Sequence, residues 1–153
     1  MPSEDGYFDE SVAARYDSDE EMFDPAVVDP VVDFLAELAG SGRALELGIG
    51  TGRIAVPLAQ RGVPVHGIDM SRAMVARLRE KPGAEKIGVT IGDFATTTVD
   101  GTFSVAYLLS ISSIASQPEA ARVELAEQVR ELAPDVPYRR LLHTELYWTR
   151  LGA

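Results

Sequence analysis

Residues 44–52 of this 153-residue chain read Ala-Leu-Glu-Leu-Gly-Ile-Gly-Thr-Gly. The apolar start of this segment, preceded by Arg43, predicts a short buried strand over residues 43–47, and the three glycines predict a tight turn after it. A helix is expected to follow and to run to about Gln60, with its free N–H groups aimed at the turn. Pro57 lies inside that helix, so we expect it to remove one backbone hydrogen bond and to bend the helix.

Strands and helices are predicted to alternate on either side of this segment. Further strands are expected at residues 63–69, 89–91, 103–109 and within 140–148, and further helices at residues 25–39, 71–81 and 118–132. The helix that begins at Pro25 is expected to bury an apolar face made of Val27, Val31, Phe34, Leu35 and Leu38. The alternation predicts an α/β fold, with a Rossmann-like open, mostly parallel sheet of about five strands and helices on both faces.

Polar residues follow two of the predicted strands, at the edge where a parallel sheet binds ligands. Asp69 ends the second strand, 21 residues beyond Gly48, where a carboxylate can accept hydrogen bonds from the two hydroxyls of a ribose. Asp93 and Phe94 follow the third strand and offer an acceptor for an amino group and an aromatic face for a flat ring. Each feature alone is more often structural, as a tight turn or a helix cap, but their convergence favours a nucleoside site.

The spacing of the glycines distinguishes between nucleotides. A dinucleotide-binding turn reads G-x-G-x-x-G, whereas the third glycine here is Gly52 and Arg53 stands at the last position of that pattern. Glu46, two residues before the first glycine, would repel a pyrophosphate but suits an ammonium or sulfonium group. S-adenosylmethionine carries an adenine, a ribose with two free hydroxyls and a zwitterionic amino-acid tail, and it matches this set. A nicotinamide-dependent oxidoreductase is therefore disfavoured but stays an alternative.

At these motifs the chain resembles the class I S-adenosylmethionine-dependent methyltransferases of the small-molecule type. The resemblance is carried by residues 44–55, 65–71 and 92–94, and residues 8–17 resemble the tyrosine-aspartate entry segment of the same family. It implies an enzyme that transfers the methyl group of S-adenosylmethionine to a small-molecule N, O or C nucleophile. Such a site acts mostly by holding the acceptor in line with an already activated methyl group.

The resemblance also implies a role for individual residues of the cofactor site. Gly48, Gly50 and Gly52 would line the methionine moiety, and Glu46 would anchor its amino end directly or through water. The remaining implied contacts are Asp69 with the ribose, Met70 against the adenine, Asp93 and Phe94 at the adenine edge, Leu109 and Ser110 beside the methyl-transfer position, and Tyr16 as a lid over the amino-acid tail.

Two departures from the family pattern limit what the resemblance implies. Ser104 stands where the family often has an acid, and residues 110–113 offer no obvious base, so the sequence identifies no catalytic residue. The family sheet normally has seven strands, but only 21 residues follow Leu132. We therefore expect a variant shortened at the C-terminus or a fragment, and a catalytically inactive cofactor-binding module is the first alternative.

The C-terminal segment suggests self-association. With the closing strands absent, the last strand would be an exposed apolar edge, which pairing with a second copy would cover. This predicts a homodimer through residues 137–148. His143 and Glu145 share one face of that strand, but two ligands are too few for a zinc site, and no metal is expected.

The composition fits one domain, divided into an acidic leader (1–24), an N-terminal helix (25–40), a cofactor-binding core (41–133) and a shortened C-terminal segment (134–153). The formal net charge is -10, without a cluster of Lys and Arg, which argues against nucleic acid and against anionic membranes. No signal peptide or membrane-spanning run is recognised and there is no cysteine, so a cytoplasmic protein is expected.

The negative charge belongs to the first part of the chain. Residues 1–33 hold eleven acids and one base, while the remaining residues hold 13 of each. The leader also contains four aromatic residues (Tyr7, Phe8, Tyr16 and Phe23), so it is either a flexible tail or a segment that packs over the domain. The second interpretation is favoured, because disordered acidic tails tend to lack aromatic residues. As a lid, it would favour a cationic or neutral methyl acceptor.

Overall fold

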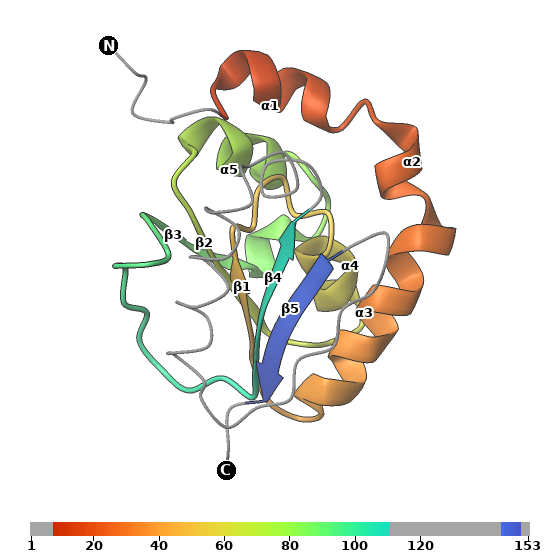
Figure 1. Cartoon of the computed structure of the whole chain (residues 1–153), viewed down its shortest axis with the longest axis vertical. Coiled ribbons are helices and arrows are strands. Elements are labelled where there is room, and N and C mark those ends of the chain that lie inside the picture. The colour runs from red at the N-terminus through yellow and green to blue at the C-terminus, as the bar shows by residue number, and fades with distance from the viewer. Residues whose placement is uncertain (1–7, 111–144, 151–153) are drawn as a thin grey trace.

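A computed structural model describes residues 8–110 and 145–150. For residues 109, 110 and 145–150 it describes the backbone but not the side chains. Its strands are β1 (Ala44–Leu47), β2 (Val65–Asp69), β3 (Gly88–Ile91), β4 (Val105–Ser110) and β5 (Glu145–Arg150). They form one sheet in the order β3-β2-β1-β4-β5. All neighbouring strands are parallel except β5, which runs antiparallel to β4 (Figure 1). The predicted open, mostly parallel sheet is thereby confirmed.

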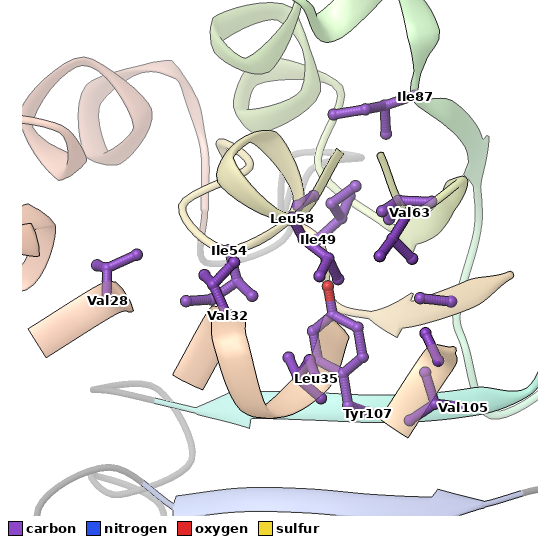
Figure 2. Close-up of a cluster of buried hydrophobic side chains, with 14 of the residues drawn as sticks. Val28, Val32, Leu35, Ile49, Ile54, Leu58, Val63, Ile87, Val105 and Tyr107 are labelled. Atoms are coloured by element: carbon purple, nitrogen blue, oxygen red, sulfur yellow. The ribbon is translucent and has the colours of Figure 1, made fainter. Parts of the chain in front are cut away.

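The helices are α1 (Glu10–Tyr16), α2 (Glu20–Phe23), α3 (Pro25–Ala39), α4 (Ala55–Gln60) and α5 (Arg72–Arg79), with a 3-10 turn, η1 (Ala84–Lys86). Buried side chains of α3, α4 and α5 form one apolar cluster with residues from a single face of the sheet (Figure 2). Helices α1 and α2 lie at the end of the sheet toward which β4 points, next to α5 and α3 (Figure 1).

The register of the parallel strands decides which side chains share this buried face. Ala44 lies opposite Val105, and Glu46 lies opposite both Gly67 and Tyr107. A Cβ atom on Gly67 would come within 2.3 Å of the side chain of Ile49, so only glycine lets the turn after β1 pack onto the neighbouring strand. The register therefore places one acidic side chain, that of Glu46, inside an otherwise apolar core.

Helix α3 buries Leu35, as predicted, but the rest of its buried stripe differs from the prediction. Val27 is 43% exposed, and the fully buried residues are Val28, Val32, Leu35 and Ala39. Val31, Phe34 and Leu38 are only partly buried at the margin of the core. Because the valines come in adjacent pairs, both stripes have helical spacing, and periodicity cannot choose between them.

Pro57 also has a different position in its helix from the one predicted. Helix α4 begins at Ala55, so Pro57 lies in its first turn, where backbone N–H groups have no partner within the helix. The cap predicted at Ser71 is confirmed, since its hydroxyl accepts a hydrogen bond from the N–H of Met74 at 3.1 Å.

Several predicted features involve residues that the structure does not describe. The helix expected over residues 118–132, His143, and most of the segment proposed to form a homodimer, residues 137–148, lie outside the described residues. The last strand is observed at Glu145–Arg150. Among the described helices, none combines the length and the apolar character that crossing a membrane requires.

Candidate functional site

The glycine-rich turn between β1 and α4 is anchored to strand β2. The N–H groups of Gly48 and Ile49 both donate to the carbonyl of Ile68, at 2.8 and 3.1 Å. Gly48 and Gly50 adopt φ angles of 74° and 55°, in the left-handed region that favours glycine. A Cβ atom on Gly48 would have the side chains of Leu108 and Phe94 as its nearest neighbours, at 3.7 and 3.9 Å. The Cβ position of Gly48 is thus in ordinary van der Waals contact with these two side chains, without a clash.

The third glycine of the turn has a packing role instead. Gly52 has a φ of +80°, and a Cβ atom there would lie 2.9 Å from Cδ1 of Leu78 in α5. Gly62 has a similar φ of +89° but nothing within 4 Å of the corresponding position. The two glycines therefore share a left-handed φ but differ in the space around the Cβ position.

This difference predicts the effect of alanine at the two positions. We expect Gly62→Ala to cost about 1–2 kcal/mol, from backbone conformation alone, and Gly52→Ala to cost about 1–3 kcal/mol more, because α4 and α5 must separate. Denaturant unfolding of the two variants measures the difference directly. Equal losses for the two variants would show that the turn and α5 are not closely packed in solution.

Asp69, at the end of β2, holds the turn from the other side. Its Oδ2 accepts a hydrogen bond from the N–H of Gly50 at 2.7 Å, and its Oδ1 accepts one from the N–H of Ser71 at 2.8 Å. One carboxylate therefore joins the glycine turn to the start of α5. A carboxylate offers about four acceptor positions, so these two bonds do not by themselves prevent it from accepting ligand hydroxyls.

Glu46 lies beneath the turn and is only 3% exposed. Its Oε2 accepts a hydrogen bond from the hydroxyl of Tyr107 at 2.9 Å. Burial raises the pKa of Glu46 to about 8, although the Tyr107 hydrogen bond and the charge of Arg53 act in the opposite direction. Glu46 is thus a buried carboxyl group whose ionisation depends on its neighbours, and a cationic group would favour its charged form.

Two further side chains surround this carboxyl group. Arg53 is 8% exposed and donates from Nη1 to the carbonyl of Met22 at 2.9 Å. Burial raises the pKa of Tyr16, and the nearby charges of Glu46 and Asp69 raise it further. Tyr16 of the leader, Glu46 of β1 and Asp69 of β2 therefore belong to one electrostatic environment around the glycine turn.

The described part of the leader, residues 8–24, lies against α5 and the glycine turn. Ala13 is buried with Ala73 and Met74 of α5, and Phe8 and Tyr16 pack beside them with their rings 6.4 Å apart, edge to face. The Ser71 hydroxyl donates to the carbonyl of Phe8, and Glu10 forms an ion pair with Arg77 at 2.9 Å. The leader therefore contributes side chains to the site.

Asp17 joins the leader to the turn itself. Its Oδ1 accepts from the hydroxyl of Thr51 at 2.6 Å, and its Oδ2 lies 2.9 Å from Nζ of Lys81. Lys81 Nζ also donates to the carbonyl of Thr51 at 2.8 Å and lies over the ring of Phe23, 4.8 Å from its centroid. We call these three residues, Asp17, Thr51 and Lys81, the leader clamp.

The other residues expected at the site lie around its rim. Met70 is 52% exposed, and Asp93 is exposed and accepts a hydrogen bond from the N–H of Ala95 at 2.9 Å. Phe94 is half-buried, near Gly48. Leu109 belongs to β4, but its side chain lies outside the described residues. The described part of the chain thus brings Tyr16, Glu46, Asp69 and Phe94 to the glycine turn.

Sequence reasoning missed two partners in this arrangement. Tyr107 reads as one apolar residue of a buried strand, and nothing in its own surroundings in the sequence announces a bond to Glu46, 61 residues away. Lys81 was expected only near the end of a helix. In both cases the sequence shows that a polar group, a hydroxyl or an ammonium, is present, but it does not show which group that polar group contacts.

The described residues fit the three parts of a nucleoside linked to an amino acid. The turn supplies glycine backbone at Gly48, Asp69 supplies a carboxylate bonded to the same turn, and exposed Met70 and half-buried Phe94 supply apolar surface. Glu46 supplies a buried acid that a cationic amino group would ionise. We conclude that the donor set suits S-adenosylmethionine better than a phosphate, which these acids would repel.

Comparison with known proteins finds methyltransferases. A family profile described as a methyltransferase domain matches residues 44–135. The phosphatidylethanolamine N-methyltransferase of Cereibacter sphaeroides is 34% identical over 100 residues, covering 61% of this chain and 48% of that protein. The cypemycin N-terminal methyltransferase of a Streptomyces species is 28% identical over 134 residues, covering 86% of this chain and 54% of that protein. The chain spans about half the length of these relatives.

Solved structures show the same fold. The glycopeptide N-methyltransferase MtfA in complex with S-adenosylmethionine is 28% identical, with a TM-score of 0.52, covering 67% of this chain and 44% of that chain. A second structure, provisionally described as an S-adenosylmethionine-dependent methyltransferase from Methanococcus maripaludis, matches with a TM-score of 0.66 at 12% identity. The match covers 98% of this chain and 96% of that chain. The second likeness concerns the fold alone.

Proposed function

The chain belongs to the methyltransferase domain family, and from this membership we propose that it transfers the methyl group of S-adenosylmethionine to a small-molecule nucleophile. The observation that carries the proposal is the Asp69 carboxylate bonded to Gly50 of the glycine turn, 2.7 Å away. That bond joins the two sequence motifs, 19 residues apart, that the cofactor would need together. Among N, O and C acceptors, nitrogen is favoured, because two of the similar proteins, the phosphatidylethanolamine and the glycopeptide enzymes, are N-methyltransferases.

The cofactor supplies an electrophilic methyl group on a sulfonium centre, so the chain's residues mainly bind and orient. We propose that the turn at Gly48 and Gly50 receives the amino-acid tail, with Glu46 as the acceptor for its amino group. Asp69 would accept from the ribose hydroxyls, and Met70, Asp93 and Phe94 would surround the adenine. Gly52 would act indirectly, by letting α5 pack against the turn.

The leader is proposed to be the lid of this site. Tyr16 lies within the electrostatic environment of Glu46 and Asp69, and the leader clamp joins the lid to Thr51 of the turn. A lid with the acids of the leader on it would favour a cationic or neutral acceptor over an anionic one, because it attracts cations and repels anions. An anionic best substrate would contradict this part of the proposal.

Weakening the clamp is expected to open the lid. Lys81→Met removes an ion pair whose two side chains are 24% and 33% exposed, which corresponds to about 0.5–1 kcal/mol. Tryptic cleavage after Arg15, in α1, should therefore become about twofold to fivefold faster, as followed by mass spectrometry. Lys86→Met removes the same charge from an exposed position and serves as the control. Equal cleavage rates for the two variants would show that the leader clamp does not hold the lid closed.

The proposed function is tested first by binding and then by turnover. Calorimetry with S-adenosylmethionine and with S-adenosylhomocysteine should show one site per chain for each, and a methyl-release assay against a panel of small amines, alcohols and carbon acids should show transfer. Binding without turnover would favour the alternative, an inactive cofactor-binding module. Failure to bind either compound, together with enhanced NADH fluorescence on mixing, would favour the second alternative, a nicotinamide-dependent oxidoreductase.

A further inference from the structure

The hydroxyl of Tyr107 is a buried polar group that the proposed mechanism does not use. Tyr107 is 1% exposed, and its ring stands on β4 among apolar side chains from α3, α4 and the glycine turn (Figure 2). Its hydroxyl donates to Oε2 of Glu46 at 2.9 Å. The two residues are direct neighbours in the parallel register of β1 and β4, so the backbone itself places the hydroxyl against the carboxyl group.

Packing alone does not require this hydroxyl. A phenylalanine would fill the same apolar space, whereas a buried hydroxyl without a partner destabilises the fold. The bond is also selective, because a phenol donates most strongly to a carboxyl group that is ionised. The hydroxyl therefore acts on the orientation and the charge of Glu46.

We propose that Tyr107 is a positioning residue, which orients the Glu46 carboxylate toward the amino group of the cofactor and makes the affinity for the cofactor depend on pH. The inference rests on the proposed function, since Glu46 is the group through which Tyr107 acts. It adds a residue from the middle of β4 to a site otherwise built from strand ends and the leader.

The groups around Glu46 determine whether its charged or its neutral form is favoured. Burial disfavours its charged form, and so does the charge of Asp69 at the end of β2. The opposite influences are the Tyr107 hydroxyl, Arg53 in the turn and the N–H of Ala55 at the start of α4. Tyr16 of α1 also lies near enough to interact with Glu46. Because Arg53 and Ala55 remain in place, removing the hydroxyl isolates one favourable interaction with the carboxylate.

The first measurement follows Glu46 directly in the protein without ligand. Tyr107→Phe keeps the ring, and circular dichroism checks that the variant folds. The carboxyl 13C signal of Glu46, assigned with Glu46→Gln, should titrate at a midpoint about one to two pH units higher in Tyr107→Phe than in the wild type. That shift is the size expected for losing a hydrogen bond to a charged group.

The second measurement links the pair to binding, with S-adenosylhomocysteine as the probe. The ratio of the Kd of Tyr107→Phe to that of the wild type should be about tenfold to 100-fold at pH 6.5. It should fall by about fivefold to tenfold by pH 9, because Glu46 is then largely ionised in the wild type and begins to ionise in Tyr107→Phe. The titration of the ligand's own amino group cancels in this ratio. Ile87→Val, a conservative change elsewhere in the core, should give a ratio that does not vary with pH.

The outcomes separate this inference from the proposed function. An unchanged Glu46 midpoint in Tyr107→Phe, or a Kd ratio that is constant over the pH range, would overturn the role of Tyr107 while leaving cofactor binding intact. Failure of the wild type to bind S-adenosylhomocysteine or S-adenosylmethionine would overturn the proposed function and the inference with it. A shifted midpoint together with a pH-dependent ratio would support both.

Discussion

Asp69→Ala is expected to weaken the binding of S-adenosylmethionine by about 1.5–3 kcal/mol, or about tenfold to 150-fold, because it removes charge-assisted bonds to the ribose. The substitution also releases the N–H groups of Gly50 and Ser71, which the carboxylate holds at 2.7 and 2.8 Å. The unfolding midpoint without ligand should therefore fall as well. Both losses are expected from one side chain, because Asp69 holds the turn and would also hold the ribose.

A ligand comparison separates the two effects of this substitution. S-adenosylhomocysteine and its 2′-deoxy analogue should differ in affinity for the wild type by about tenfold, and they should bind Asp69→Ala almost equally. A disordered turn would weaken both ligands without removing the difference between them. Asp100→Ala, which removes an exposed acid, controls for net charge. If Asp69→Ala still distinguishes the two ligands, the ribose is held by another residue.

The cofactor half of the fold could be predicted because its signals are local. The glycines at 48, 50 and 52, the strand that precedes them and Asp69 after the next strand all lie within 26 residues of the chain, from Ala44 to Asp69. Parallel strands joined by short connections bring their carboxyl ends to one edge. The convergence of these residues therefore follows from the order of strands and helices, without knowledge of the packing.

The parts that could not be predicted depend on packing between distant segments. The bond between Tyr107 and Glu46 requires the exact register of two strands, and a shift by one residue would send the two side chains to opposite faces. The leader clamp requires Asp17, Thr51 and Lys81, which come from three separate segments. Helix α3 could bury either of two stripes, because its valines come in pairs. The spacing of apolar residues predicts that a helix forms, but it does not predict which of two equally apolar faces is buried.

Glu46→Gln is expected to stabilise the protein without ligand and to weaken the cofactor site. The pKa of Glu46 is raised from 4.5 to about 8 in the folded state. Between these values the folded protein retains a proton that the unfolded chain has released, so stability falls as pH rises through this window and is constant above about pH 8. Glutamine keeps a carbonyl acceptor for the Tyr107 hydroxyl and never ionises. Its advantage should be absent near pH 4 and reach roughly 2–5 kcal/mol at pH 8.5.

The measurement is the difference in unfolding free energy between Glu46→Gln and the wild type, followed from pH 4 to pH 8.5. Other titrating groups largely cancel in this difference, so its slope reports the carboxyl group itself. A competing arrangement has the opposite sign: if Glu46 were already ionised as the partner of buried Arg53, the substitution would leave that cation without compensation and destabilise the protein. The guanidinium donates instead to the Met22 carbonyl at 2.9 Å, which favours stabilisation. If Glu46→Gln is more stable than the wild type but binds S-adenosylhomocysteine at least about tenfold more weakly, Glu46 is a buried acid that destabilises the fold and serves ligand binding.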